Sequence, residues 1–267
     1  MGHPTYRPGA RRVNARHPLD SWEARRVEWF VFWTIYLGLG AACTLAELIR
    51  PAHKVRYRKA LVMDVIACLV AQFAVFEVAE WVTGPVGDAA RQSPIVLATW
   101  LPFRIAAYYL AADFGSYWMH RLMHTRYAWR IHRWHHSPEQ LYWLAGVRTT
   151  VPQQILFNLP YVLALPLLAD TPQWFAMAAL VENVARNHWM HMNVAWRSNW
   201  LERVFVTPRY HHIHHSADAA LHDGNYGSLF SIWDRLFGTY IDPGTTTPKK
   251  FGTGEPKRDP VLLMLGV

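Results

Sequence analysis

The chain has 267 residues, of which 52% are hydrophobic, and its formal net charge is +8. Its mean hydropathy of −0.03 excludes a bundle made only of membrane helices and indicates a protein partly in lipid and partly in water. The basic residues flank apolar runs and no nucleic-acid-binding motif accompanies them, so we expect a membrane, and no nucleic acid, as the partner of this charge.

The first 27 residues form a polar, arginine-rich segment that lacks the apolar core of a signal peptide. Five apolar runs follow, at residues 29–49, 60–82, 94–112, 151–169 and 174–191. Because about 20 apolar residues cross a bilayer, the first two runs qualify plainly and the others are marginal. The sequence therefore predicts an all-α fold, an integral membrane helical bundle with about four core spans. Cys43 and Cys68 lie within these runs, so we expect neither a disulfide framework nor cysteine metal ligands.

The charge of the loops predicts the orientation of the bundle. Residues 50–59 are strongly basic, which places this loop in the cytoplasm by the positive-inside rule. Residues 83–92 and 170–173 carry little positive charge and fall outside. The first run is basic at both ends, so it is either a re-entrant or interfacial helix, broken at Gly38-Leu39-Gly40, or an exception to the rule.

Two stretches are expected outside the membrane: residues 114–150, which the spacing of their histidines predicts to be helical, and residues from 195 to the end. Prolines and glycines after Tyr240 indicate loop there. We divide the chain into a basic N-terminal segment (1–27), a membrane-embedded domain that includes the histidine-rich stretch (28–241), and a C-terminal tail (242–267).

Twelve of the 15 histidines lie between His120 and His222. They include three clusters whose spacing of i, i+3 or i+4 puts imidazoles on one helix face. The clusters are His120/His124, His132/His135/His136 and His211/His214/His215, and His191 lies between the second and the third. Imidazole ligates Zn, Cu, Fe and Ni, and one ion takes about four to six ligands. Nine imidazoles therefore predict a site for two metal ions, and by the orientation above it lies on the cytoplasmic side of a bacterial inner membrane or of the endoplasmic reticulum.

Several neighbouring residues are left open by the sequence. His188 and His212 lie outside the i, i+3, i+4 frame of their clusters, so each is either a ligand or a packing residue. Three aspartates are expected either to orient a ligand imidazole through its second nitrogen or to cap helices: Asp113, Asp223 and Asp234. Arg121 stands where a zinc metalloprotease has glutamate, which excludes that class.

The order HxxxH, HxxHH, HxxHH among membrane spans resembles the fatty acid hydroxylase / sterol desaturase superfamily of membrane-bound histidine-box di-iron oxidases. Residues 207–215 look like the last box of that family, and residues 223–239 look like the stretch that follows it. The resemblance covers about residues 95–241. It implies two Fe ions, O2 as co-substrate, four core helices under a cytoplasmic cap, and a further ligand best matched by His191. Asn187 stands where some members have a paired histidine, which leaves open whether Asn187 or His188 joins the ligands.

The resemblance also implies the reaction, which is O2-dependent hydroxylation or desaturation of an unactivated C–H bond in a lipid. Sterols, fatty acyl chains, sphingoid bases, ether lipids and carotenoids are all substrates of this class. We expect no cytochrome b5 domain in the remaining length, so a separate ferredoxin- or cytochrome b5-like donor supplies electrons, and the basic cytoplasmic face suits an acidic one. The alternative is a membrane protein that binds or handles metal without catalysis. The sequence does not predict the oligomeric state.

Overall fold

A computed structural model describes residues 22–58, 61–73, 100–168, 171, 173–256 and 258–267. The arginines at positions 11–16, the loop at residues 83–92 and parts of the second and third apolar runs lie outside the described residues. The chain divides into two compact units, Met1–Gly38 and Leu39–Val267. The described part of the first unit is the beginning of helix α1 (Trp22–Ile49).

Helix α1 continues through the predicted break at residues 38–40, so that prediction is wrong. A glycine inside a helix lowers helix stability by only about 1 kcal/mol relative to alanine. Two glycines are therefore not enough to break an otherwise apolar helix. Gly40 also has a packing role, because a Cβ atom there would lie 2.6 Å from the ring of Trp143.

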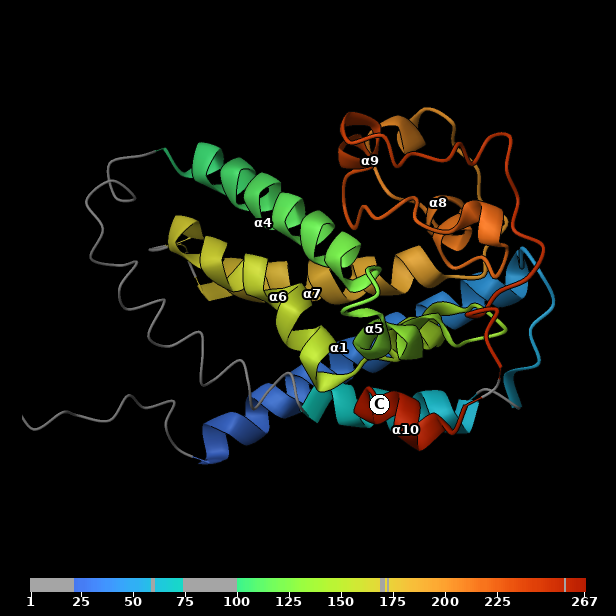
Figure 1. Ribbon diagram of the computed structural model, residues 1–267. Coiled ribbons are helices and arrows are strands. Elements are labelled where there is room, and N and C mark those ends of the chain that lie inside the picture. Colours follow the sequence, from blue (N-terminus) through green and yellow to red (C-terminus); the bar gives the residue numbers. More distant parts are fainter. Residues whose placement is uncertain (1–21, 59–60, 74–99, 169–170, 172, 257) are drawn as a thin grey trace, which may run out of the picture. The chain divides into compact units, whose positions relative to one another are not determined.

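The second unit is helical, and its described residues contain no strand, only three isolated bridges. The all-helical prediction is therefore confirmed. After an apolar helix at Leu61–Phe73, the elements in chain order are α4 (Leu101–Met123), α5 (Trp129–His136), η2 (Trp143–Val147), α6 (Val151–Ala164), η3 (Leu165–Leu168), α7 (Gln173–His191), η4 (Leu201–Arg203), α8 (Pro208–His214), η5 (Ala219–Leu221), α9 (Ile232–Leu236) and α10 (Pro260–Leu265) (Figure 1).

Helices α4 and α6 pack side by side (Figure 1). They approach closely at Gly115, where a Cβ atom would lie 2.6 Å from Cβ of Pro160. The predicted helix at residues 114–150 is only partly present, because α4 ends at Met123 and α5 begins at Trp129. The Thr125 hydroxyl donates to the Leu122 carbonyl (2.7 Å) and closes the turn between them.

Three helices begin with the same local signal, a capping side chain followed by proline in the first turn. The Thr150 hydroxyl caps α6, the Thr207 hydroxyl caps α8 and the Asp259 carboxylate caps α10. The last of these contradicts the prediction that all the chain after Tyr240 is loop, because α10 packs on α5 through Leu263 and Trp134.

Two helices are long and apolar enough to cross a membrane, Trp29–Ile49 and Val151–Leu168. In each, only 17% of the residues of the most apolar window are buried within the protein. The helix at Leu61–Phe73 is apolar but shorter in its described part. The described residues thus contain two candidate spans, whereas the sequence predicts about four core spans.

Candidate metal centre

All nine predicted ligand histidines come together in two groups. The first group contains His120, His124, His132, His136 and His214, and the second contains His135, His191, His211 and His215. Within each group the ligand atoms lie within 4.8 Å of one another. Eight of the nine histidines are buried, and the side chain of His124 is 9% exposed.

Helices α5 and α8 each supply both groups. In the motif of α5, the i, i+4 pair His132/His136 joins the first group and His135 joins the second. In the motif of α8 the assignment is reversed, because His211 and His215 join the second group and His214 joins the first. Helix α4 completes the first group and the end of α7 completes the second, with His191. The HxxHH spacing therefore serves two adjacent sites from one short helix.

The Nε2 atoms converge at distances that fit shared ions. In the second group, the Nε2 atom of His191 lies 3.1 Å from that of His211, 3.2 Å from that of His215 and 3.3 Å from that of His135. In the first group, Nε2 of His132 lies 3.1 Å from Nε2 of both His120 and His136. Ligands at about 2.1 Å from one ion are about 3.0 Å apart at right angles and about 3.4 Å apart in a tetrahedron.

Backbone carbonyls determine which ring nitrogen carries the proton. Nδ1 of His120 donates to the Tyr226 carbonyl (2.8 Å), Nδ1 of His135 donates to the Arg148 carbonyl (3.1 Å), and Nδ1 of His191 donates to the Asn187 carbonyl (2.7 Å). Nε2 of His135 and of His191 is then unprotonated, and the two lone pairs face each other. Such an arrangement is repulsive unless a cation lies between them, and hydrogen-bonded imidazoles of this kind are typical metal ligands.

Protons do not take the place of that cation at neutral pH. Burial lowers the pKa of His120 to about 3 and that of His135 to about 4. Burial and the other histidines together hold the pKa of His132 and His215 well below the usual value of 6.5. The buried Nε2 atoms of His124 and His214 have no hydrogen-bond partner. Neutral imidazoles with free lone pairs are the form that metal ions bind.

The two groups are neighbours. The rings of His136 and His215, one from each group, stack with centroids 4.4 Å apart, and those of His132 and His135 stack at 5.1 Å. Five nitrogen ligands exceed what a tetrahedral zinc site uses. Five and four imidazoles leave one and two positions of an octahedron free, which gives room for a small oxygen ligand.

A short loop after α8 supplies two of the orienting carbonyls. The Gly224 carbonyl accepts from Nδ1 of His214 (2.9 Å), as the Tyr226 carbonyl does from His120. Asn225 in this loop has a left-handed backbone (φ 57°), which asparagine tolerates better than most residues. Its side-chain amide donates to the Tyr210 and Ile241 carbonyls, so the turn is tied to α8 and to the segment beyond α9.

Two of the three aspartates singled out in the sequence, Asp113 and Asp234, hold backbone amides and no imidazole. The Asp234 carboxylate accepts from the amides of Tyr226 (2.8 Å) and Gly227 (2.7 Å). Asp113 accepts from two backbone amides and the Trp233 indole. Asp223 lies 4.0 Å from Nδ1 of His124 but is largely exposed. The carbonyls that orient the imidazoles were missed because a backbone acceptor leaves no residue-type signal; the left-handed turn was the available sign.

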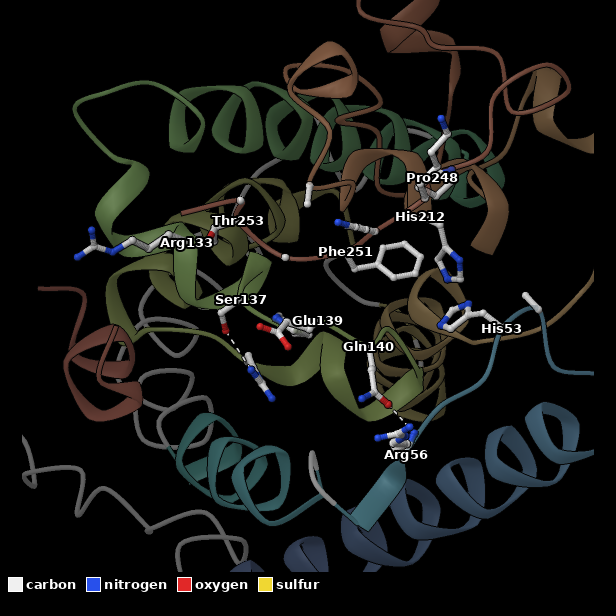
Figure 2. A pocket seen from close by; sticks show the side chains of 18 of the residues that line it. His53, Arg56, Arg133, Ser137, Glu139, Gln140, His212, Pro248, Phe251 and Thr253 are labelled. Atoms are coloured by element: carbon white, nitrogen blue, oxygen red, sulfur yellow. Dashed lines mark hydrogen bonds between the residues drawn. The ribbon is translucent and has the colours of Figure 1, made fainter. Parts of the chain in front are cut away.

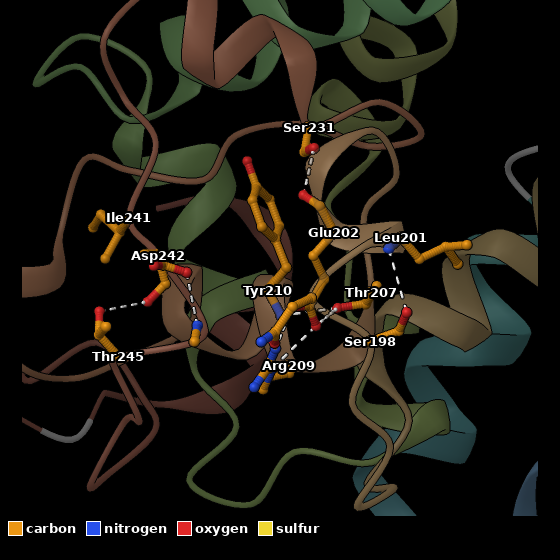
Figure 3. Close-up of polar contacts among 12 residues, drawn as sticks. Ser198, Leu201, Glu202, Thr207, Arg209, Tyr210, Ser231, Ile241, Asp242 and Thr245 are labelled. Carbon is orange, nitrogen blue, oxygen red and sulfur yellow. Dashed lines mark hydrogen bonds and ion pairs between the residues drawn. The ribbon is translucent and has the colours of Figure 1, made fainter.

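A polar cluster positions α8, which carries His211 and His214 and is followed directly by His215 (Figure 3). The Thr207 hydroxyl accepts from the Tyr210 amide (3.3 Å) and donates to the Glu202 carboxylate (2.8 Å). Arg209 pairs with the same carboxylate, and the Ser231 hydroxyl donates to the Glu202 carbonyl (2.9 Å). The side chain of the buried Glu202 thus fixes the start of α8, and its backbone carbonyl binds Ser231, the residue before α9.

The three residues that the sequence left open lie outside both groups. His188 is buried against the ring of Trp143 (centroids 4.8 Å apart). The ring of His212 packs against those of His53 and Phe251. The Asn187 side chain donates to the Gly146 carbonyl (3.4 Å), and its own carbonyl orients His191. Asn187 therefore takes part through its backbone.

Comparison with known proteins agrees with this geometry. The sequence model of one family, fatty acid hydroxylase, matches residues 105–239. The chain is 33% identical over 145 residues to alkylglycerol monooxygenase of Danio rerio, which covers 53% of this chain and 30% of that protein. It is 34% identical over 149 residues to the ornithine lipid hydroxylase OlsE of Rhizobium tropici (54% and 43%) and 25% identical over 151 residues to methylsterol monooxygenase 1-3 of Arabidopsis thaliana (55% and 50%).

These matches span between about a third and a half of the relatives' own length. The match to the family model at residues 105–239 includes all nine grouped histidines. No solved structure matches the chain.

Proposed function

The chain belongs to the fatty acid hydroxylase family, and from this premise we propose that it is a membrane-embedded, di-iron lipid hydroxylase. The reaction joins one oxygen atom of O2 to an unactivated C–H bond and releases the other as water, with two electrons and two protons supplied from outside. Hydroxylation is favoured over desaturation because the relatives named above are a hydroxylase and two monooxygenases. The lipid itself is a sterol, fatty acyl, sphingoid, ether-lipid or carotenoid substrate.

The nine grouped histidines are the proposed iron ligands, through Nε2 in those whose Nδ1 donates to a carbonyl. Bound iron supplies the redox chemistry that activates O2. The chain's own part is positioning. The carbonyls of Arg148, Asn187, Gly224 and Tyr226 fix imidazole orientation, and the burial of both groups keeps water from the reacting centre.

The membrane arrangement is part of the same proposal. Helices α1 and α6 with η3 contain the two candidate spans, and we place the Leu61–Phe73 helix and α4 or α7 beside them to give about four core spans. Lipid-facing helices would let an apolar chain enter sideways from the bilayer. The basic loop at residues 50–59 puts the histidine groups on the cytoplasmic side, as a cap over the spans.

The convergence of nine imidazoles, eight of them buried, in two groups is the observation that carries this proposal. The test is comparative lipidomics of cells that contain the wild-type chain or the His135→Ala variant, grown under 18O2. We expect a hydroxylated lipid that carries 18O with the wild type and none with the variant. Full product formation by the variant would remove the proposal.

The alternative, metal handling without catalysis, gives a different result in the same experiment. It predicts exchangeable metal on the purified chain, no labelled lipid in either strain and no O2 consumption. A lipid two hydrogens lighter and without 18O would instead identify a desaturase.

A further inference from the structure

A cavity of about 1290 Å³ lies in the second unit, and none of the nine grouped histidines lines it. Its walls come from the loop after α1, from α5 and the segment after it, from residues 194–197 and from the C-terminal segment (Figure 2). Nine lysines and arginines line it, against two acidic residues, Glu139 and Glu255, among the described residues. We call it the basic cavity.

Part of this charge is uncompensated. Arg148 pairs with Asp64, Arg209 with Glu202 and Arg258 with Glu255. Five exposed cations that line the cavity form no ion pair within the part of the chain that is described: Lys54, Arg56, Arg197, Lys249 and Lys250. They come from three separate stretches of sequence and meet at one concave surface. Cations of one sign around a concavity focus positive potential and attract an acidic partner.

The cavity also reaches the second metal group. His212 lines it, is only 6% exposed, and follows His211 directly in the sequence. Its ring lies beside the backbone of His191, another member of that group. Figure 2 shows His212, His53 and Phe251 turned toward one another at this edge of the cavity. A single peptide bond therefore joins His212, in the wall of the cavity, to His211, a proposed metal ligand.

We propose that the basic cavity is the docking site of an acidic, one-electron carrier protein. This rests on the proposed function, because each hydroxylation consumes two electrons that must be supplied to the metal centre. Two successive carriers each lose one electron and become oxidised, and each electron enters beside His212 and reaches the metal through the second group. Uncompensated charge at the rim speeds association and makes it sensitive to salt, which suits a brief contact with a carrier.

The test uses the full chain in discs of zwitterionic lipid and two acidic carriers, a [2Fe–2S] ferredoxin and the soluble haem domain of cytochrome b5. The variant Lys249→Glu/Lys250→Glu reverses two exposed charges of the cavity. The control Arg126→Glu/Arg130→Glu makes the same change in charge at exposed positions outside it. We expect at least one carrier to bind the wild type, more weakly as salt rises. The cavity variant should raise Kd by about tenfold or more and the control by less than about twofold.

Reduction of the iron-loaded chain separates this proposal from the proposed function. Dithionite should reduce wild type and cavity variant at the same rate, while reduction by the carrier should slow only in the cavity variant. If dithionite reduces no metal, the proposed function fails, whereas the binding measurement still decides on the docking site. Equal Kd values for the two variants, or no salt-dependent binding of either carrier, would overturn the docking site. If neither carrier binds in zwitterionic discs, and soluble short-chain phosphatidylglycerol binds the wild type but not the cavity variant, lipid headgroups occupy the cavity and the docking site is overturned too.

Discussion

A Cβ atom at Gly146 would lie 2.3 Å from Nδ1 of His191. This nitrogen donates to the Asn187 carbonyl, so any added side chain displaces the imidazole from its orienting acceptor. We expect Gly146→Ala to weaken metal binding in the second group about tenfold to a hundredfold, as loss of an outer hydrogen bond does elsewhere. Metal titration of the purified variant measures this. Gly38→Ala is the matched control, because nothing lies within 4 Å of its added atom; equal loss in both would contradict the packing argument.

Asp234 gives a second prediction for a residue that touches no metal ligand. Its carboxylate accepts from two amides of the carbonyl-bearing loop and from the hydroxyls of Tyr210 and Thr239. Asn at this position replaces one acceptor oxygen with a donor, so two buried donors lose their partner. We expect Asp234→Asn to lower the free energy of unfolding by about 2 to 3 kcal/mol and to loosen the first group. Urea unfolding should show little change for the exposed Asp242→Asn.

At this scale the sequence predicted which histidines come together, but not the backbone groups that orient them. Helical spacing identified eight of the nine grouped histidines, because a helix turns i, i+3 and i+4 toward one side whatever lies around it. His191 was added because it lies between the second and third clusters and because it best matches the further ligand that the family resemblance implies. The sequence could not show that His132 and His135 belong to different groups, since this depends on where α7 and α8 pack. Two of the aspartates predicted as possible partners of imidazole, Asp113 and Asp234, bind backbone amides instead.

Among the elements, α8 carries the most function for its length. It has seven residues and supplies His211 and His214, and a helix this short depends on its cap. Thr207→Ala removes the acceptor of the Tyr210 amide and leaves the buried Glu202 with one donor fewer. We expect unfolding to become easier by about 1 to 2 kcal/mol, with weaker metal binding in both groups. Asp218→Ala, which removes the cap of the ligand-free η5, should leave metal binding unchanged.

Helix positions were predicted with uneven success for local reasons. Apolar length predicted α1 and α6, and a Thr-Pro or Asp-Pro start marks α8 and α10 in the sequence. The end of α4 was missed because it depends on one turn closed by Thr125. Helix α10 was missed because its partner, Trp134, is distant in the sequence.

At the scale of the whole molecule, the buried histidines make the metal-free chain sensitive to acid. Their pKa values lie below 6.5 when folded, about 3 for His120 and about 4 for His135. The unfolded chain therefore binds more protons below pH 6.5, and stability must fall as pH drops from there toward about 4. Thermal unfolding of the metal-free chain in detergent should show a falling Tm over this range. A Tm that stays constant would contradict the neutral, buried state of these imidazoles.

The fold class could be predicted from composition and apolar runs, because an apolar run indicates burial in protein or in lipid whichever residues it contacts. Which side of the membrane each loop faces, and how many of the described helices cross it, depends on the bilayer as well as on the chain. The basic N-terminal segment, the catalytic domain and the C-terminal tail likewise remain predictions, although the tail ends in a helix packed on α5.

The count of iron bound per chain tests the central claim most directly. The anaerobically reconstituted wild type should bind about two ions of iron, one in each histidine group. The variant His211→Ala/His215→Ala removes two of the four ligands of the second group and should retain about one. A wild type that binds no more than one ion, or a variant that still binds two, would contradict the account.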